Sequence, residues 1–343
     1  MAVGYAGRGL PGRFTPGRRL YRQEREGKSI KLESILAFGF LRHAADMRRF
    51  PAAIRRYATS CLLLPLLVLL GSGCSTINVA YTAGPTVLAF MADGYLDLDS
   101  DQSALLKERI LAVREWNRTT QMTDYARFLG EVRGKAVGNV TPDDVARAVA
   151  EARKRWSVMA EHVAGEIADM APQLTPANIA ALKKKIAKRN AEYVKETLEA
   201  PPHKTRERRF ERIKEEAERW YGSLDDAQLE RIRGWVAALP VNYPLALEDR
   251  KRRQGEFVAI MEAAVSRKAD RAETRQRLQR LLTAWETGRS PAYQAFAAQV
   301  TAENLKLAAN VVNMATPAQR EILNRRAQRW VDDMNALATR PAP

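Results

Sequence analysis

Cysteine, histidine and long apolar runs are scarce in this chain of 343 residues. Its two cysteines are Cys61 and Cys74, and it has three histidines. Beyond Cys74 no second cysteine remains for a disulfide, and no His-Glu-x-x-His, Gly-x-Ser-x-Gly or paired-cysteine metal pattern occurs. These absences predict no metal site, no cofactor and no catalytic centre. We expect a protein that is not an enzyme and whose stability comes from buried apolar side chains.

The main apolar run, Cys61–Leu70, is too short to cross a membrane. At about 1.5 Å per residue it spans roughly 15 Å, half of the hydrocarbon core of a bilayer. It has the length of the apolar region of a signal peptide, and Gly71 to Gly73 lead from it into Cys74. This pattern resembles the bacterial lipobox, in which the cysteine is lipidated and becomes the first residue. The usual box has leucine three places before the cysteine, whereas here Leu70 stands four places before it.

Signal cleavage is therefore predicted between Gly73 and Cys74, with Cys74 carrying acyl chains such as palmitate. Because no aspartate follows the cysteine, we expect the outer membrane, with the body on its periplasmic face, rather than the inner membrane. Residues 47–73 form a signal of ordinary length, whose arginines precede the apolar run. Residues 1–46 are then a mis-assigned extension ahead of Met47 or a disordered leader.

The basic charge is concentrated in the part that cleavage would remove. Residues 1–73 hold 13 of the 56 basic and 4 of the 40 acidic residues. The remaining chain has 43 basic and 36 acidic residues, a net charge of +7. The basic residues of this remaining part are dispersed along the sequence, so we expect no nucleic-acid partner. The runs Lys183–Lys185 and Arg250–Arg253 are typical of solvated helix faces, with attraction to anionic lipid as the alternative.

Helical spacing recurs through the mature chain, and strand patterns are nearly absent. The clearest stripe runs over Thr141–Met170, where apolar residues follow one another at steps of three and four. Pro172 ends it, and a second stripe extends to Pro201. We expect an all-α fold, an elongated bundle of antiparallel helices that follows an N-terminal lipoprotein signal peptide.

The predicted domain layout follows from these stripes and from the prolines between them. The helical domain is expected over residues 91–338, with a possible internal boundary near 200–204 or 240–244. Residues 74–90 are expected to be a tether, and residues 339–343 a disordered tail.

Five helix starts share one pattern. Each has an N-cap oxygen followed three residues later by an amide or acid that can bond back to the cap N–H, as in a capping box. The residues are Asp99 with Gln102, Thr141 with Asp144, Thr175 with Asn178, Asp225 with Gln228, and Thr316 with Gln319. Well-capped helices explain them without a further role. A likeness to the Leu-Thr-x-x-Gln motif of small helical periplasmic chaperones is the alternative.

Other patterns also have plain explanations. Asp97, Asp99, Asp101 and Glu108 match four positions of a calcium-binding EF-hand loop, but Gln102 stands where that loop needs glycine. The acids are better explained as a helix start. The tryptophans lie mostly on helical stripes and predict core anchors rather than a sugar platform.

One segment carries a family resemblance. It comprises Phe90-Met-Ala-Asp-Gly-Tyr-Leu-Asp-Leu-Asp-Ser-Asp-Gln102, followed by Leu105-Leu-Lys-Glu-Arg109, with Tyr81 between it and Cys74. Together with the lipobox it resembles an uncharacterised family of Gram-negative lipoproteins, domain of unknown function 6279. The resemblance covers Cys74 to about Met334. It implies a lipoprotein and an all-helical body, and it implies no activity or site residue.

Two functions remain open at this stage. The first is a structural or interaction lipoprotein of the cell envelope, which binds the membrane through its lipid anchor and has an envelope protein as partner. The second is a periplasmic chaperone- or foldase-like binder of exported polypeptides, although the Arg-x-x-Phe-Asp-Tyr signature of lipase foldases is absent. The sequence sets neither the ligand nor the oligomeric state.

Overall fold

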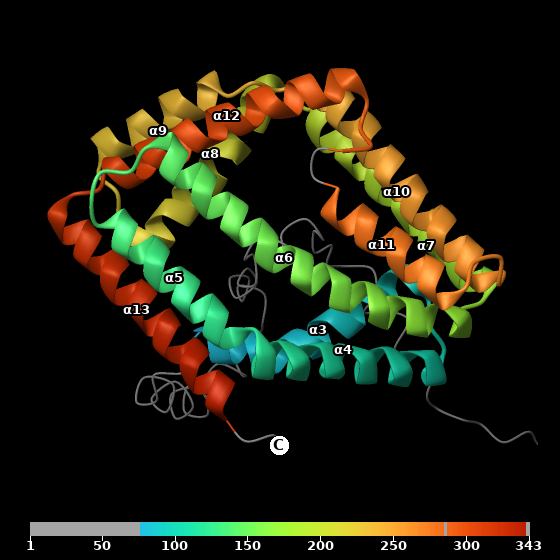
Figure 1. The fold of residues 1–343 in the computed structure, drawn as a ribbon. Helices are drawn as coiled ribbons and strands as arrows, with labels where there is room; N and C mark the ends of the chain where they lie inside the picture. Colours follow the sequence, from blue (N-terminus) through green and yellow to red (C-terminus); the bar gives the residue numbers. More distant parts are fainter. Residues whose placement is uncertain (1–75, 285–286, 341–343) are drawn as a thin grey trace, which may run out of the picture. The chain divides into compact units, whose positions relative to one another are not determined.

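The computed structural model describes residues 76–284 and 287–340, and every regular element within them is a helix. The predicted all-α fold is confirmed (Figure 1). Gly73, Cys74 and the predicted signal lie outside the described residues, as do residues 341–343. Among the described helices, none is both long enough and apolar enough to span a bilayer. The α-helices are α3 (Thr76–Leu96), α4 (Ser100–Thr120), α5 (Met122–Ala136), α6 (Pro142–Met170), α7 (Pro176–Tyr193), α8 (Pro202–Tyr221), α9 (Asp226–Ala238), α10 (Tyr243–Val265), α11 (Arg271–Thr283), α12 (Pro291–Asn313) and α13 (Pro317–Thr339), with short helices η3 (Ala171–Gln173) and η4 (Val194–Leu198).

Residues 74–90, expected to be a tether, are helical from Thr76 onward. The β-branched residues and the internal Pro85 of α3 disfavour an isolated helix. Tertiary packing offsets that weakness, because α3 contacts α4, α7 and α13. The hydroxyl of Tyr81 donates to the carbonyl of Arg114 in α4 at 2.6 Å. The first described helix is therefore part of the folded body.

The buried apolar side chains form three clusters, and two of these share partly buried neighbours and together make up the first of two cores. The first core lies among α6, α7, α10 and α11, and its buried residues include Leu182, Ile260 and Leu278. The second core lies among α8, α9, α12 and α13, around Ile232 and Leu323. Ile260, Leu278 and Ile232 are at most 1% exposed. At roughly 25 cal/mol per Å² of apolar surface, burial of such side chains is the main stabilising term.

The chain passes between these cores more than once. Helices α8 and α9 line the second core, α10 and α11 return to the first, and α12 and α13 end in the second. The first two of these crossings fall at residues 199–201 and 239–242, next to the two boundaries expected from the prolines, and the third follows α11. Ser72–Pro343 form one compact unit, so these crossings do not separate consecutive domains.

Helix α6 joins the two regions. It has 29 residues and is therefore about 43 Å long. Its last residue, Met170, is buried in the first core. Ahead of its start, the side chain of Asn313 accepts from the N–H of Val140 and donates to its carbonyl, both at 2.8 Å. Asn313 is the last residue of α12, which fixes the start of α6 beside the second core.

Candidate functional sites: helix-start clasps and an arginine pocket

All five repeated helix starts form capping boxes. In each, the N-cap oxygen accepts the N–H of the third helical residue, whose own side chain accepts the N–H of the cap. Each box therefore satisfies two backbone donors that the helix itself leaves unpaired. The caps are Asp99, Thr141, Thr175, Asp225 and Thr316.

The boxes of α4 and α7 are joined by their side-chain amides. Gln102 donates through Nε2 to the carbonyl of Gln173 at 2.8 Å and to Oδ1 of Asn178 at 3.1 Å. In return, Nδ2 of Asn178 donates to the carbonyls of Leu96 and Asp97, at 3.0 and 3.2 Å. We call this arrangement the first clasp. It holds two helix starts that are 76 residues apart in sequence.

The boxes of α9 and α13 repeat the arrangement as a second clasp. Gln228 Nε2 donates to Oε1 of Gln319 at 2.8 Å and to the carbonyl of Met314 at 3.2 Å. The reverse bonds run from Gln319 Nε2 to Oε1 of Gln228 and to the carbonyl of Ser223, both at 2.9 Å. Gln228 is 1% exposed and Gln319 is 8% exposed, so the paired amides are buried.

One geometric rule describes both clasps. Each paired amide reaches the carbonyl that lies two residues before the N-cap of its partner: Gln173, Asp97, Met314 and Ser223. An amide can do this because its oxygen accepts the cap N–H while its NH₂ group donates across the clasp. A carboxylate would complete the capping box but would have no proton to donate.

The box at Thr141 differs in this respect. Its third helical residue is Asp144, whose Oδ2 accepts the N–H of Thr141 at 3.0 Å. Hydrogen bonds from Thr141, and then from Arg147, hold the pKa of Asp144 well below its usual range. A carboxylate cannot donate across a clasp, and here Asn313 bonds to the backbone of Val140 instead. The sequence therefore distinguishes paired from unpaired boxes by the third helical residue, which has an amide side chain in the paired boxes and a carboxylate in the unpaired one.

Of the acids considered for calcium, Asp97 and Asp99 belong to the first clasp, Asp101 lies in the first turn of α4, and Glu108 lies further along that helix. Asp99 is the N-cap of α4, and Asp93 accepts the N–H of Leu98 at 3.0 Å. Asp97 has a left-handed backbone, with φ at +51°. Across residues 76–284 and 287–340, no three His, Cys, Asp or Glu side chains are grouped so that they could hold a metal ion.

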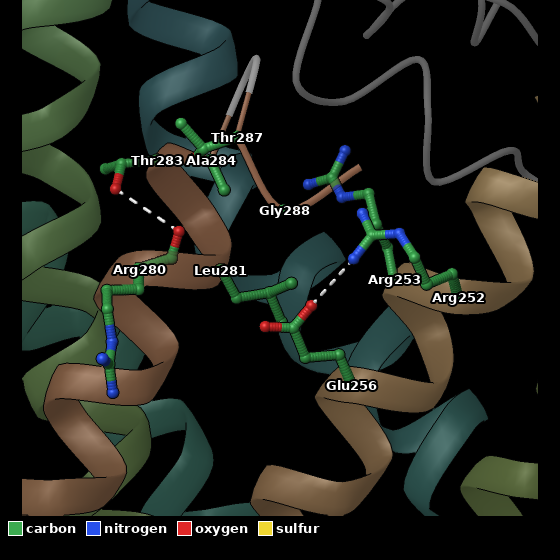
Figure 2. A pocket seen from close by; sticks show the side chains of 9 residues that line it. All are labelled: Arg252, Arg253, Glu256, Arg280, Leu281, Thr283, Ala284, Thr287 and Gly288. Atoms are coloured by element: carbon green, nitrogen blue, oxygen red, sulfur yellow. Dashed lines mark hydrogen bonds and ion pairs between the residues drawn. The ribbon is translucent and has the colours of Figure 1, made fainter. Parts of the chain in front are cut away.

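A second candidate site is a pocket of about 260 Å³ between α10 and α11 (Figure 2). Figure 2 shows Arg252 and Arg253 entering from α10, and Arg280 lies on the α11 side. The chain after α11 closes the pocket with Thr287 and Gly288. Arginine fixes planar anions through paired N–H groups, so the lining suits a carboxylate or a phosphate.

The charges at this pocket are unevenly balanced. Arg252 bonds to Asp249 and to Glu256, each at 3.2 Å. The side chains of Arg289 and Asp249 are only 8% and 7% exposed and lie 3.2 Å apart, and Nε of that arginine has no hydrogen-bond partner. Burial lowers the pKa of Arg253, and the neighbouring arginines lower it further. A bound anion would relieve this repulsion.

The basic run Arg250–Arg253 is therefore not a simple solvated face. Arg250 donates through Nε to Asn190 Oδ1 at 3.0 Å and lies over the ring of Tyr193. Burial lowers its pKa. Only Lys251 of the four is exposed. The sequence did not indicate this burial, because the composition of a basic run does not show which face of its helix other elements cover.

A histidine and two tryptophans of α4 and α6 are half-buried and contact other helices. His162 of α6 stacks on Trp116 of α4, with ring centroids 3.9 Å apart. Its Nε2 is 3.9 Å from Glu166. Trp156 donates to the carbonyl of Leu282 at 2.9 Å. These contacts tie helices together, in keeping with a packing role.

Comparison with known proteins gives one match. The model of a family of unknown function, DUF6279, matches residues 94–294. No curated protein and no solved structure matches the chain. The matched range contains the first clasp and the residues that line the arginine pocket, and it ends before Thr316 of the second clasp. Because the match covers more than half of the chain, the chain belongs to the family of unknown function DUF6279.

Proposed function

We propose that this protein is a lipid-anchored helical module of the cell envelope that acts by binding a partner. The observation that carries the proposal is the position of Cys74. This cysteine follows an apolar run of signal-peptide length, and helix α3 of the folded body begins two residues later, at Thr76. Acyl chains on Cys74 would hold the helical body at the membrane surface. Two or more such chains give stable attachment, at about 0.8 kcal/mol per buried methylene.

Cys74→Ser tests the anchor. Cells expressing the full chain are labelled with radioactive palmitate, and the membrane and soluble fractions are separated. We expect the unmodified chain to carry label and to sediment with membranes, and the variant to lose the label and to accumulate unprocessed or in the soluble fraction. A variant that is processed and remains membrane-bound would contradict the anchor.

The choice of membrane has its own test. Ser75 follows the cysteine where retention in the inner membrane would call for aspartate. Ser75→Asp should therefore move the labelled protein from the outer-membrane to the inner-membrane fraction, and Ser75→Asn serves as the matched uncharged control. Outer-membrane recovery of both variants would contradict this basis for the localisation.

We expect a partner's acidic group to bind in the arginine pocket. The support is local: Arg253 is partly buried, its pKa is lowered, and two more arginines line the same pocket. Inorganic phosphate is a direct probe, because a ligand that binds only the folded state raises the melting temperature. We expect millimolar phosphate to raise it for the unmodified protein and not for Arg253→Gln. Arg212→Gln, at an exposed position on α8, is the control.

The chaperone-like alternative has weaker support. Its sequence basis was the repeated cap pattern, and the amides of that pattern are buried in the clasps. Amides used in this way are not available to a client polypeptide. We therefore expect the fragment Ser75–Pro343 not to suppress aggregation of an unfolding client. Protection at substoichiometric amounts, reduced by Gln228→Ala with Gln319→Ala beyond their effect on stability, would reverse this ranking.

A further inference from the structure

Helix α3 carries no charge over its first 17 residues. Between Arg56 and Asp93 the chain contains no Lys, Arg, Asp or Glu, although 28% of the whole chain is charged. A stretch of 17 residues at that composition would hold about five charged residues. The segment Thr76–Ala92 is nevertheless part of a helix on the surface of the folded body. Its lack of charge distinguishes it from the other helices.

One face of α3 is covered and the opposite face is open. The helix packs against α4, α7 and α13, and Pro85 and Met91 are buried there. Thr82, Thr86 and Phe90 are exposed and follow one another at four-residue steps, which places them on one face. Phe90 is 69% exposed, more than any other large apolar side chain that is exposed in the described residues. The open face from Thr82 to Phe90 is therefore uncharged and ends in an exposed aromatic ring.

The predicted anchor lies at the start of this same helix. Thr76 is the second residue after Cys74, which limits the distance between them to about 7 Å. Phe90 lies 14 residues further along α3, or about 21 Å. A cation also marks the start of the helix, because Nη2 of Arg340 donates to Oδ1 of Asn78 at 3.3 Å. An anionic headgroup surface would complement that charge.

We propose that the open face of α3, from Thr82 to Phe90, lies in the boundary between headgroups and acyl chains of the membrane that holds Cys74. This inference rests on the proposed lipid anchor and adds the orientation of the body to it. An aromatic side chain is suited to this boundary, where interfacial helices bury their apolar face by about 5–10 Å. The tether is too short to keep the start of α3 away from the bilayer. With the start of α3 held there, insertion of the Phe90 ring into the bilayer would place the open face of the helix against the membrane.

Spin-label depth measurement tests the inference on the full lipidated protein in vesicles of phosphatidylethanolamine and phosphatidylglycerol. Cys74 is the only cysteine of residues 74–343, so an introduced cysteine is the only free thiol once Cys74 is acylated. A nitroxide at Thr86→Cys is compared with one at Ala237→Cys, an exposed position on α9. The measured quantity is the ratio of relaxation by oxygen, which enters the bilayer, to relaxation by a water-soluble nickel chelate. We expect this ratio to be several-fold higher for the label at position 86 than for the label at position 237. Equal, water-like ratios would overturn the inference.

A charge variant provides the second arm. With the label moved to Ala83→Cys, Thr86→Glu should return the ratio to the aqueous value, and Ala237→Glu should leave it unchanged. Both substitutions are at exposed positions, so the circular dichroism should stay the same. Protection of the label from both relaxing agents would also overturn the inference, since a protein would then cover the face. Palmitate labelling separates the two proposals. If the protein takes up no palmitate, the lipid anchor is contradicted. If it takes up palmitate but the nitroxide at position 86 gives a water-like ratio, only this inference is contradicted.

Discussion

At the residue scale, the paired amides carry more than their capping role. Gln228 is 1% exposed, and its side chain takes part in four hydrogen bonds, to the cap, the partner amide and a carbonyl. A buried donor or acceptor that loses its partner costs about 1–3 kcal/mol, while loss of an ordinary N-cap costs about 1 kcal/mol. The clasp therefore forms only where the third helical residue has an amide nitrogen that can donate, and not where it has a second carboxylate oxygen.

Gln228→Glu tests this distinction. The introduced carboxylate keeps an acceptor for the N–H of Asp225 but loses the donor to Met314 and faces Oε1 of Gln319. We expect the free energy of unfolding at pH 7 to fall by about 3 kcal/mol, measured from urea midpoints at constant m-value. The loss should shrink as pH falls and the introduced carboxyl becomes protonated. Asp225→Asn keeps the capping oxygen and should be nearly neutral. Equal effects of the two variants would show that only the cap matters.

Tyr221 gives a prediction at alkaline pH. It is 5% exposed in the second core, and burial raises the pKa of its hydroxyl from 10.0 to about 12. The unfolded chain therefore loses this proton before the folded chain does, and the folding stability falls as pH rises from 10 to 12. The loss due to this residue should reach about 2 kcal/mol.

Tyr221→Phe is the corresponding measurement. Urea midpoints of the variant and of the unmodified chain are compared from pH 7 to pH 12. We expect near agreement at pH 7 and a smaller alkaline loss in the variant. Other tyrosines whose pKa is raised by partial burial, among them Tyr193, contribute to both curves alike. Parallel curves over the whole range would contradict the assignment.

At the element scale, α6 depends on contacts at both of its ends. Its first turn has a capping box but no amide to form a clasp, and Asn313 takes that role from outside. Its last turn is buried in the first core through Met170. At this same end, Nη2 of Arg271 donates to Asp169 at 3.0 Å, which ties α6 to α11. A 29-residue helix is thus held by different chemistry at each end.

Asn313→Ala tests the start of α6. Both polar groups of Val140, which is 8% exposed, would lose their partner. We expect a loss of about 2 kcal/mol in unfolding free energy, with faster hydrogen exchange at the Val140 amide. Asn310→Ala lies on the same helix at an exposed position and should change neither. Unchanged exchange at Val140 in the first variant would contradict the role of Asn313.

At the scale of the whole molecule, the interleaved chain path couples the two cores. Neither core is built from one continuous stretch, because α8 and α9 are inserted between α7 and α10 of the other. Each core also has a clasp next to it, formed by helix starts far apart in sequence. Loss of one core would release the helices that frame the other. Cooperative unfolding of residues 76–340 is the consequence.

Two core truncations test this coupling. Ile232→Ala in the second core and Leu278→Ala in the first core remove side chains that are both 0% exposed. Each should cost about 2–5 kcal/mol in a single urea transition. We also expect each to speed hydrogen exchange in α9 and α11 alike, since the slowest amides open with the whole unit. Faster exchange confined to the truncated core would show that the cores unfold separately.

Local signals in the sequence determined much of this protein. The proline stops, the apolar stripes and the N-cap residues set the extents of α6, α7 and the later helices, because each signal acts over about one helical turn. The resemblance to DUF6279 rested on the short segment around Phe90 to Arg109, and the match over residues 94–294 confirms it. The predicted lipid anchor at Cys74 depends on the sequence alone, since it lies outside the described residues.

Tertiary structure decided what distant segments do to one another. The clasps join caps 76 and 91 residues apart, and no spacing within a single cap indicates its partner. Helix α3 forms despite Pro85 because α4, α7 and α13 cover one of its faces. Arg252 and Arg253 line a pocket because α11 and the following turn pack beside α10. Capping acts within a few residues, whereas burial and pairing depend on where the chain returns.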